Sequence, residues 1–234
     1  MRLDKYLSDM KIGTRSEVKK LIKKGVVLVN KQVITTPEYA ILEAIDHVVC
    51  QGNEIEYETN VYYLLHKPAG YVCATKDNLY PTVLELIDIP RKEVLFPVGR
   101  LDVDTEGLVL LTSDGALAHE LLAPKKHVSK RYLATIEGLV TEEEVARFQE
   151  GLDLGDFYTK PAILTIHKIE GNHSTVEVTI VEGKFHQIKR MFQKVGMKVV
   201  YLKRLQMGAL TLPDDLLCGA YRKLTRSEVI EGIG

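Results

Sequence analysis

From residue 61 onward the chain contains a series of short strand-like runs, which constrain its fold more than any other feature. Five runs are rich in Val, Ile, Leu, Thr and Tyr, at residues 61–67, 107–115, 131–138, 162–170 and 174–183. In STVEVTIVE the apolar and polar residues alternate, as in an antiparallel strand with one exposed face. Neighbouring runs are joined by short turns. The pattern predicts an α+β fold with a mainly antiparallel, mixed sheet.

Two amphipathic segments predict helices that flank this sheet. TEEEVARFQEGL begins with a potential N-cap at Thr141. HQIKRMFQKVG places Ile188 and Phe192 on one apolar stripe and ends at Gly196.

The first 31 residues differ from the rest in charge and in pattern. They contain nine Lys and Arg and three Asp and Glu, a net charge of +6 in a chain whose total is −1. Apolar residues recur at helical spacing between Leu3 and Met10, and Thr14 with Glu17 has the spacing of a capping box. A second helix to Lys23 and a hairpin near residues 30–31 should follow. This basic unit is expected to contact a polyanion.

A polar stretch, NEIEYETNV at residues 53–61, predicts a linker. We therefore expect a small domain over residues 1–55 and a larger one over residues 60–234.

Composition narrows the possible classes of protein. Hydrophobic residues make up 45% of the chain, and the three cysteines lie far apart with no CxxC pair. This disfavours a zinc ribbon or a disulfide framework. The first ten residues are too charged for a signal peptide, and no run approaches the ~18 apolar residues of a membrane span. We expect a soluble cytoplasmic protein.

The stretch GRLDVDTEG, residues 99–107, concentrates carboxylates in one loop. An EF-hand starting at Asp102 would need an oxygen ligand or water near its ninth position and Glu at its twelfth, where Leu110 and Ser113 stand. No histidine pair has zinc spacing, and no phosphate-binding glycine motif occurs. We expect neither a metal nor a cofactor. Spacing alone does not distinguish Asp102 from Asp104 or Glu106 as a functional group.

Longer motifs resemble known families. MRLDKYL followed by TRSEVKKLIKKGVVLVN resembles the S4 RNA-binding domain. This resemblance implies RNA contacts from the basic residues of that region, Arg2, Arg15, Lys19, Lys20 and Lys23.

GRLDVDTEGLVLLTSDG resembles the catalytic motif of RsuA/RluA-type pseudouridine synthases, and HKPAGYV, SKRYLATIEG and EGKFHQIKRMF match further motifs of that family in order. With the S4-like start and GYVCATKDNLYPTVLELI, the resemblance is to the RsuA branch. It implies a cofactor-free enzyme that isomerises uridine in RNA.

The resemblance also implies roles for three residues. Asp102 carries over as the catalytic residue, and Lys189 as the cation beside it, where many relatives have Arg. Tyr132 carries over as the residue that stacks on the target base and stands near a proton to be removed. Without the family, Lys189 could belong to an exposed helix face and Tyr132 to the core.

Other assignments are less specific. Arg100 is predicted to hold the place of the flipped-out nucleotide or to hold a backbone phosphate, and Arg190 to contact phosphate. Lys130 belongs to a basic stretch beside Tyr132. Leu205 is either an apolar floor under the uracil or a core residue.

We therefore expect an enzyme that converts one uridine of 16S ribosomal RNA to pseudouridine, after flipping it into a pocket. Its partner would be 16S RNA or a small-subunit assembly intermediate, and the enzyme itself a monomer. Two alternatives are the same chemistry on 23S RNA and a non-catalytic RNA-binding assembly factor.

Overall fold

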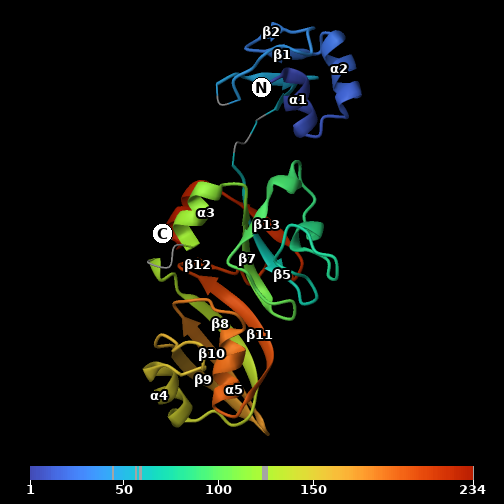
Figure 1. Cartoon of the computed structure of the whole chain (residues 1–234). Coiled ribbons are helices and arrows are strands. Elements are labelled where there is room, and N and C mark those ends of the chain that lie inside the picture. The colour runs from blue at the N-terminus through green and yellow to red at the C-terminus, as the bar shows by residue number, and fades with distance from the viewer. Residues whose placement is uncertain (44, 56, 58–59, 123–125, 234) are drawn as a thin grey trace. The chain divides into compact units, whose positions relative to one another are not determined.

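The computed structural model describes residues 1–43, 45–55, 57, 60–122 and 126–233, and the chain separates into two compact units (Figure 1). The first unit comprises residues 1–60 and 88–94, and the second comprises residues 61–87 and 95–234. Residues 56, 58 and 59 of the predicted linker lie outside the described residues. Its first three residues form a strand, so the linker prediction was wrong there.

The first unit consists of two helices and a four-stranded antiparallel sheet of order β2-β1-β3-β4. Its elements are α1 Leu3–Asp9, α2 Arg15–Lys23, β1 Val27–Val29, β2 Gln32–Val33, β3 Val48–Cys50 and β4 Asn53–Ile55. The capping box of Thr14 and Glu17 is formed, and the first hairpin turns at Asn30 and Lys31. The predicted two helices and hairpin are confirmed, but a second hairpin, β3–β4, was not predicted.

Apolar faces of both helices and the sheet form the core of the first unit. Leu3, Leu7, Val18 and Ile22 are fully buried from the helices, and Val27 from β1. The lysines of α2 therefore lie on the opposite side of its axis, toward solvent.

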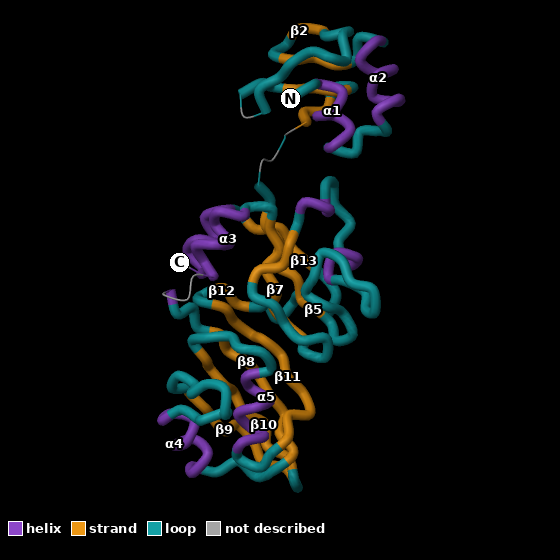
Figure 2. Tube along the Cα trace, in the orientation of Figure 1, coloured by secondary structure: helices purple, strands orange, loops and turns teal. Residues whose placement is uncertain are grey.

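The second unit contains a mixed sheet of nine strands. Strands are coloured orange in Figure 2. The order along its path is β13-β5-β7-β11-β8-β10-β9, with β6 and β12 paired to β7 and β11. Its strands are β5 Tyr62–Lys67, β6 Phe96–Val98, β7 Glu106–Thr112, β8 Lys130–Glu137, β9 Ile163–Glu170, β10 His173–Ile180, β11 Lys198–Met207, β12 Leu210–Thr211 and β13 Tyr221–Leu224. Among these described strands only β7 and β11 pair in parallel. The predicted mainly antiparallel mixed sheet is confirmed.

Helices cover the two ends of this sheet differently. The helices are α3 Gly115–Leu122, α4 Glu142–Glu150, α5 Gln187–Lys194 and α6 Arg226–Ile233, with 3-10 turns η1 Val83–Leu86 and, in the first unit, η2 Lys92–Val94. α4 packs on β9 and α5 on β11, whereas α3 and α6 share a core with β5 and β7 (Figure 1).

The predicted α4 and α5 are confirmed. No described helix has the length and apolarity needed to span a membrane.

The parallel contact between β7 and β11 depends on a glycine. Gly107 has φ +108°, and a Cβ added there would lie 2.6 Å from the backbone nitrogen of Arg204 and nearer still to its oxygen. Only a residue without a side chain allows the two strands to approach so closely. Gly107 therefore allows β7, the strand that follows residues 99–105, to pair with β11 in the middle of the sheet.

We predict that Gly107→Ala lowers the free energy of unfolding by about 2–4 kcal/mol, because it combines overpacking with an unfavourable φ. The control is Gly115→Ala, where no atom lies within 4 Å of the added Cβ. Urea unfolding of the two variants measures the difference. Equal midpoints for both variants would contradict the close approach described here.

Candidate active site

The carboxylate loop, residues 99–105, connects β6 to β7 and places Asp102 above the centre of the sheet. The backbone nitrogen of Thr105 donates to the carbonyl oxygen of Asp102 at 3.1 Å, which closes a turn. The backbone nitrogen of Leu101 donates to Sγ of Cys73 at 3.3 Å. The loop is thus held on both sides of Asp102. On one side a turn links Asp102 to Thr105, which directly precedes β7, and on the other side Leu101 is bonded to Cys73.

Lys67, at the end of β5, holds the same loop through hydrogen bonds to its backbone carbonyl groups. Its side chain is fully buried, and its ammonium donates to the carbonyl oxygens of Pro68, Val103 and Thr105 at 3.0, 3.3 and 2.7 Å. Burial lowers the pKa of Lys67, opposed by the nearby carboxylates of the loop. The HKPAGYV motif therefore positions the turn that carries Asp102, a role that the sequence did not assign.

Lys189, from α5, compensates the charge of the carboxylate loop. Its Nζ lies 3.1 Å from Oδ2 of Asp102 and 2.5 Å from Oδ1 of Asp104. Burial disfavours the charged ammonium, but the bonds to Asp104 and Asp102 outweigh it and raise the pKa of Lys189. Burial would likewise raise the pKa of Asp104, but its bond to Lys189 lowers it. Lys189 and Asp104 are therefore both charged at neutral pH.

His186 places its imidazole near the other carboxylate oxygen of Asp102. Its Nε2 lies 3.7 Å from Oδ1 of Asp102, and its backbone has φ +50°, in the left-handed region. This strained position precedes α5 directly and turns the imidazole toward the carboxylate loop.

A cavity of about 450 Å³ opens beside Asp102 and is lined by five of the predicted site residues. Its lining includes all three residues of the predicted catalytic set, together with two predicted RNA-binding cations: Asp102, Tyr132, Lys189, Arg100 and Lys130. Tyr132 is 7% exposed. The cavity therefore presents a carboxylate, an ammonium and a phenol ring to one bound group.

Arg204 lines the same cavity, although the sequence analysis assigned it no role. It is 1% exposed, lies opposite Tyr132 on β11, and lines the cavity floor. Its Nε donates to the carbonyl oxygen of Leu108 at 2.8 Å, and a terminal nitrogen donates to that of Gly99. Arg204 thus fixes the start of the carboxylate loop from within the core.

Two predicted residues lie elsewhere. Arg190 does not line the cavity, because it pairs with the carboxylate of Asp156 and lies 5.2 Å from the ring centroid of Phe157. Leu205 does not line the cavity either, and the apolar part of the lining includes Leu101, Ile180, Ile188 and Leu202 instead. The expectation of an apolar floor at Leu205 was therefore wrong.

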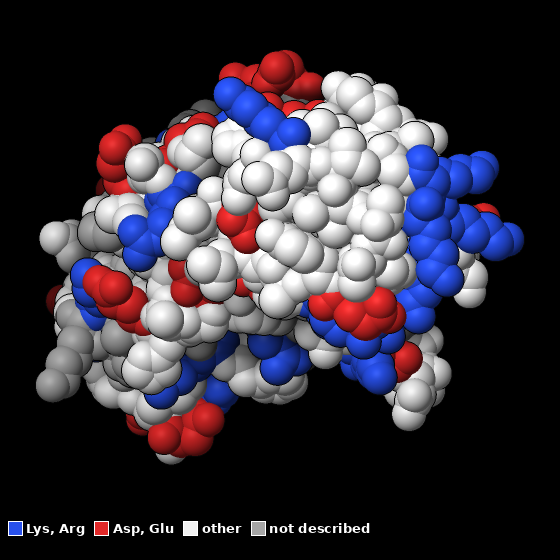
Figure 3. Space-filling model, turned by 90° about the horizontal axis from the view of Figure 1, so that it is seen from above, with Lys and Arg blue, Asp and Glu red and all other residues white. Residues whose placement is uncertain are grey.

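The cations predicted in the first unit fall into two groups. Arg2 pairs with Asp4 at 2.8 Å and Glu38 at 2.9 Å, and Lys19 lies 3.8 Å from Asp4. The second group has no described carboxylate within ion-pair distance and is exposed: Arg15, Lys20 and Lys23. Lys and Arg side chains gather along one edge of the face in Figure 3, on the side where α2 lies in Figure 1.

The residues that the structure describes contain no cluster of three or more His, Cys, Asp or Glu that could hold a metal ion. The carboxylates of Asp102 and Asp104 share one cationic partner, Lys189.

We predict that Lys67→Met lowers the free energy of unfolding by about 1–3 kcal/mol, because three carbonyl groups in buried or part-buried hydrogen bonds lose their donor. Amide hydrogen exchange should become faster in residues 102–105 specifically. Lys168→Met, on the exposed part of β9, serves as the control. If exchange in the loop stays at the wild-type rate, Lys67 does not hold it.

Comparisons with known proteins agree with this architecture. Residues 61–194 match the RNA pseudouridylate synthase family, and residues 1–43 match the S4 domain. The chain is 40% identical to an RNA pseudouridine synthase of Bacillus subtilis, with 98% of this chain and 97% of the relative covered. It is 38% identical to ribosomal small subunit pseudouridine synthase A of Escherichia coli, with 98% of each covered.

A crystal structure of a pseudouridylate synthase superposes with a TM-score of 0.68 at 38% identity, covering 99% of each chain. With these matches and the S4 domain at its start, the chain belongs to the RNA pseudouridylate synthase family.

Proposed function

We propose that this enzyme converts a specific uridine of 16S ribosomal RNA into pseudouridine, in the cavity lined by Asp102. The observation that carries the proposal is the convergence of Asp102, Tyr132 and Lys189 on one cavity. The choice of 16S RNA is supported by the Escherichia coli relative, whose name refers to the small ribosomal subunit. The enzyme acts in the cytoplasm as a monomer, on 16S RNA or a small-subunit assembly intermediate.

The reaction moves the bond between base and sugar. The bond from N1 of uracil to C1′ breaks, the base turns within the cavity, and C5 bonds to C1′. C5 then loses its proton and N1 gains one, so that the product is an isomer of the substrate. Asp102 acts at C1′, where its negative charge is already present and needs no neighbouring base to activate it. A cavity that stays closed around the detached base keeps it in reach of the sugar.

Lys189 permits a carboxylate to remain ionised beside a stacked base. A desolvated carboxylate is unfavourable unless a cation compensates for it, and Lys189 lies 3.1 Å away. As a point charge, lysine cannot form the bidentate pair that arginine would, and here it bonds to Asp104 as well. Asp104 therefore orients the cation, and the contact of Lys189 with Asp102 uses Oδ2 alone.

Tyr132 and the basic groups complete the proposed site. The ring of Tyr132 stacks on the uracil, and its hydroxyl stands where the C5 proton is removed. Arg100 and Lys130 contact the sugar-phosphate backbone of the flipped nucleotide. In the same proposal residues 1–55 act as the RNA-binding domain and residues 60–234 as the catalytic domain.

We predict that Asp102→Asn abolishes pseudouridine formation in 16S transcripts while leaving RNA affinity nearly unchanged, because the amide keeps the shape but loses the charge. Mass spectrometry after carbodiimide labelling detects the product, and filter binding measures affinity. Asp214→Asn, an exposed site, is the matched control. Product formed by Asp102→Asn would refute the catalytic assignment.

The basic side of α2 supports a second test in the full chain. We predict that replacing Lys19, Lys20 and Lys23 with Gln flattens the dependence of log affinity on log salt, by about 0.7–0.9 for each phosphate that α2 no longer neutralises. The triple Lys→Arg variant keeps the charges and should keep the slope. An unchanged slope in the Gln variant would mean that α2 does not contact RNA.

A further inference from the structure

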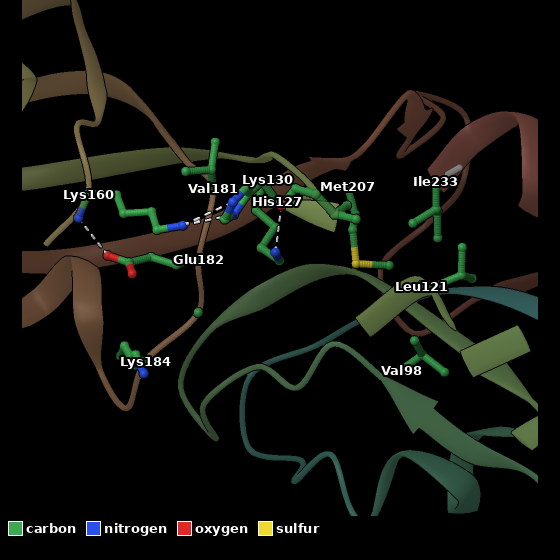
Figure 4. Close-up of a pocket in the computed structure, with 12 residues that line it drawn as sticks. Val98, Leu121, His127, Lys130, Lys160, Val181, Glu182, Lys184, Met207 and Ile233 are labelled. Carbon is green, nitrogen blue, oxygen red and sulfur yellow. Dashed lines mark hydrogen bonds between the residues drawn. The ribbon is translucent and has the colours of Figure 1, made fainter. Parts of the chain in front are cut away.

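A second cavity, of about 310 Å³, adjoins the cavity of Asp102 (Figure 4). The two cavities share Lys130, Gly183 and Lys184 in their linings. The volume falls at the lower end of the roughly 300–1,000 Å³ of small-molecule sites. The proposed reaction at Asp102 makes no use of this second space.

The lining of the second cavity has two chemically distinct sides. In Figure 4 four apolar side chains lie on the right and two lysines on the left, with Val181 on the side of the lysines. The apolar side is formed by Val98, Leu121, Met207 and Ile233, and the basic side includes His127, Lys160 and Lys184. Such a lining suits a ligand with a flat apolar body and a negative group, as a nucleotide has.

The single described carboxylate in this lining does not neutralise the lysines. Glu182 accepts hydrogen bonds on one oxygen from the backbone nitrogen of Lys160 and from Nε2 of Gln187, both at 2.9 Å. The ammonium of Lys160 turns instead to His127, with Nζ 2.8 Å from Nδ1. The described part of the cavity therefore keeps an excess of positive charge.

Lys130 stands in the wall that the two cavities share. Its Nζ donates to the carbonyl oxygen of Val128 at 2.6 Å, and no described carboxylate lies within ion-pair distance. Burial and the charge of Arg204, partly offset by Glu182, lower the pKa of Lys130 to about 8. A phosphate placed beside Lys130 would supply the missing negative partner.

We propose that the second cavity binds the nucleotide adjacent to the target uridine, with its base on the apolar side and the linking phosphate at Lys130. One phosphate joins two neighbouring nucleotides. If the nucleotides occupy the two cavities, that phosphate lies at the wall that the cavities share. The inference rests on the proposed function, because it takes the target uridine to occupy the cavity of Asp102. It adds a subsite through which the enzyme holds the RNA in register.

Binding of short nucleotides tests the subsite directly. The probes are UMP and the dinucleoside monophosphates ApU and UpA, which extend uridine on either side, with affinities measured by calorimetry. In the wild type one dinucleotide should bind at least about tenfold more tightly than UMP, because its second base is buried on the apolar side of the second cavity in addition to the phosphate that UMP already carries. Equal affinities for UMP and both dinucleotides would overturn the proposal.

One variant assigns the gain to this cavity. Val128→Trp fills the second cavity, whose lining includes Val128 while that of the cavity of Asp102 does not, so it should keep UMP affinity and abolish the dinucleotide gain. Lys168→Gln on β9 should keep both. A dinucleotide gain that persists in Val128→Trp would overturn the subsite.

The proposed function is tested separately, by measuring pseudouridine formation in 16S transcripts with the wild-type enzyme. Product without a dinucleotide gain would overturn the subsite alone. Absence of product would overturn the proposed function whatever the dinucleotides do.

Discussion

The ion pair between Lys189 and Asp102 is the interaction on which the candidate site depends. It joins a helix that packs on β11 to the loop that precedes β7, and it balances a carboxylate inside a cavity. Around it, buried cations secure the loop from two sides: Lys67 through the carbonyl groups at its end, and Arg204 through Gly99 at its start. The geometry of one side chain is thus fixed by several distant segments.

Much of the fold could be predicted because its signals are local. The alternation in β10 and the capping box before α2 each involve only neighbouring residues. The hairpin β3–β4 was missed because its strands have three residues each, and NEI reads as polar linker. The parallel pairing of β7 with β11 joins segments about a hundred residues apart, and no local pattern encodes it.

The residues of the candidate site could be predicted where they belong to a sequence motif with a chemical role. They could not be predicted where the role of a residue depends on its burial. Asp102, Tyr132 and Lys189 come from three separate motifs and line one cavity. Lys67 and Arg204 look like surface cations in sequence, yet both are buried and bond to backbone carbonyl groups. Arg190 is engaged by Asp156, an ion pair between residues far apart that the sequence does not reveal.

A crystal structure of the enzyme bound to a 16S RNA fragment carrying 5-fluorouridine at its modified position would test the central claim most directly. The account predicts the fluorinated base inside the cavity, stacked on Tyr132, with the sugar against the carboxylate of Asp102 and Lys189 still paired to it. A base that remains stacked in the RNA, or a sugar remote from Asp102, would contradict it.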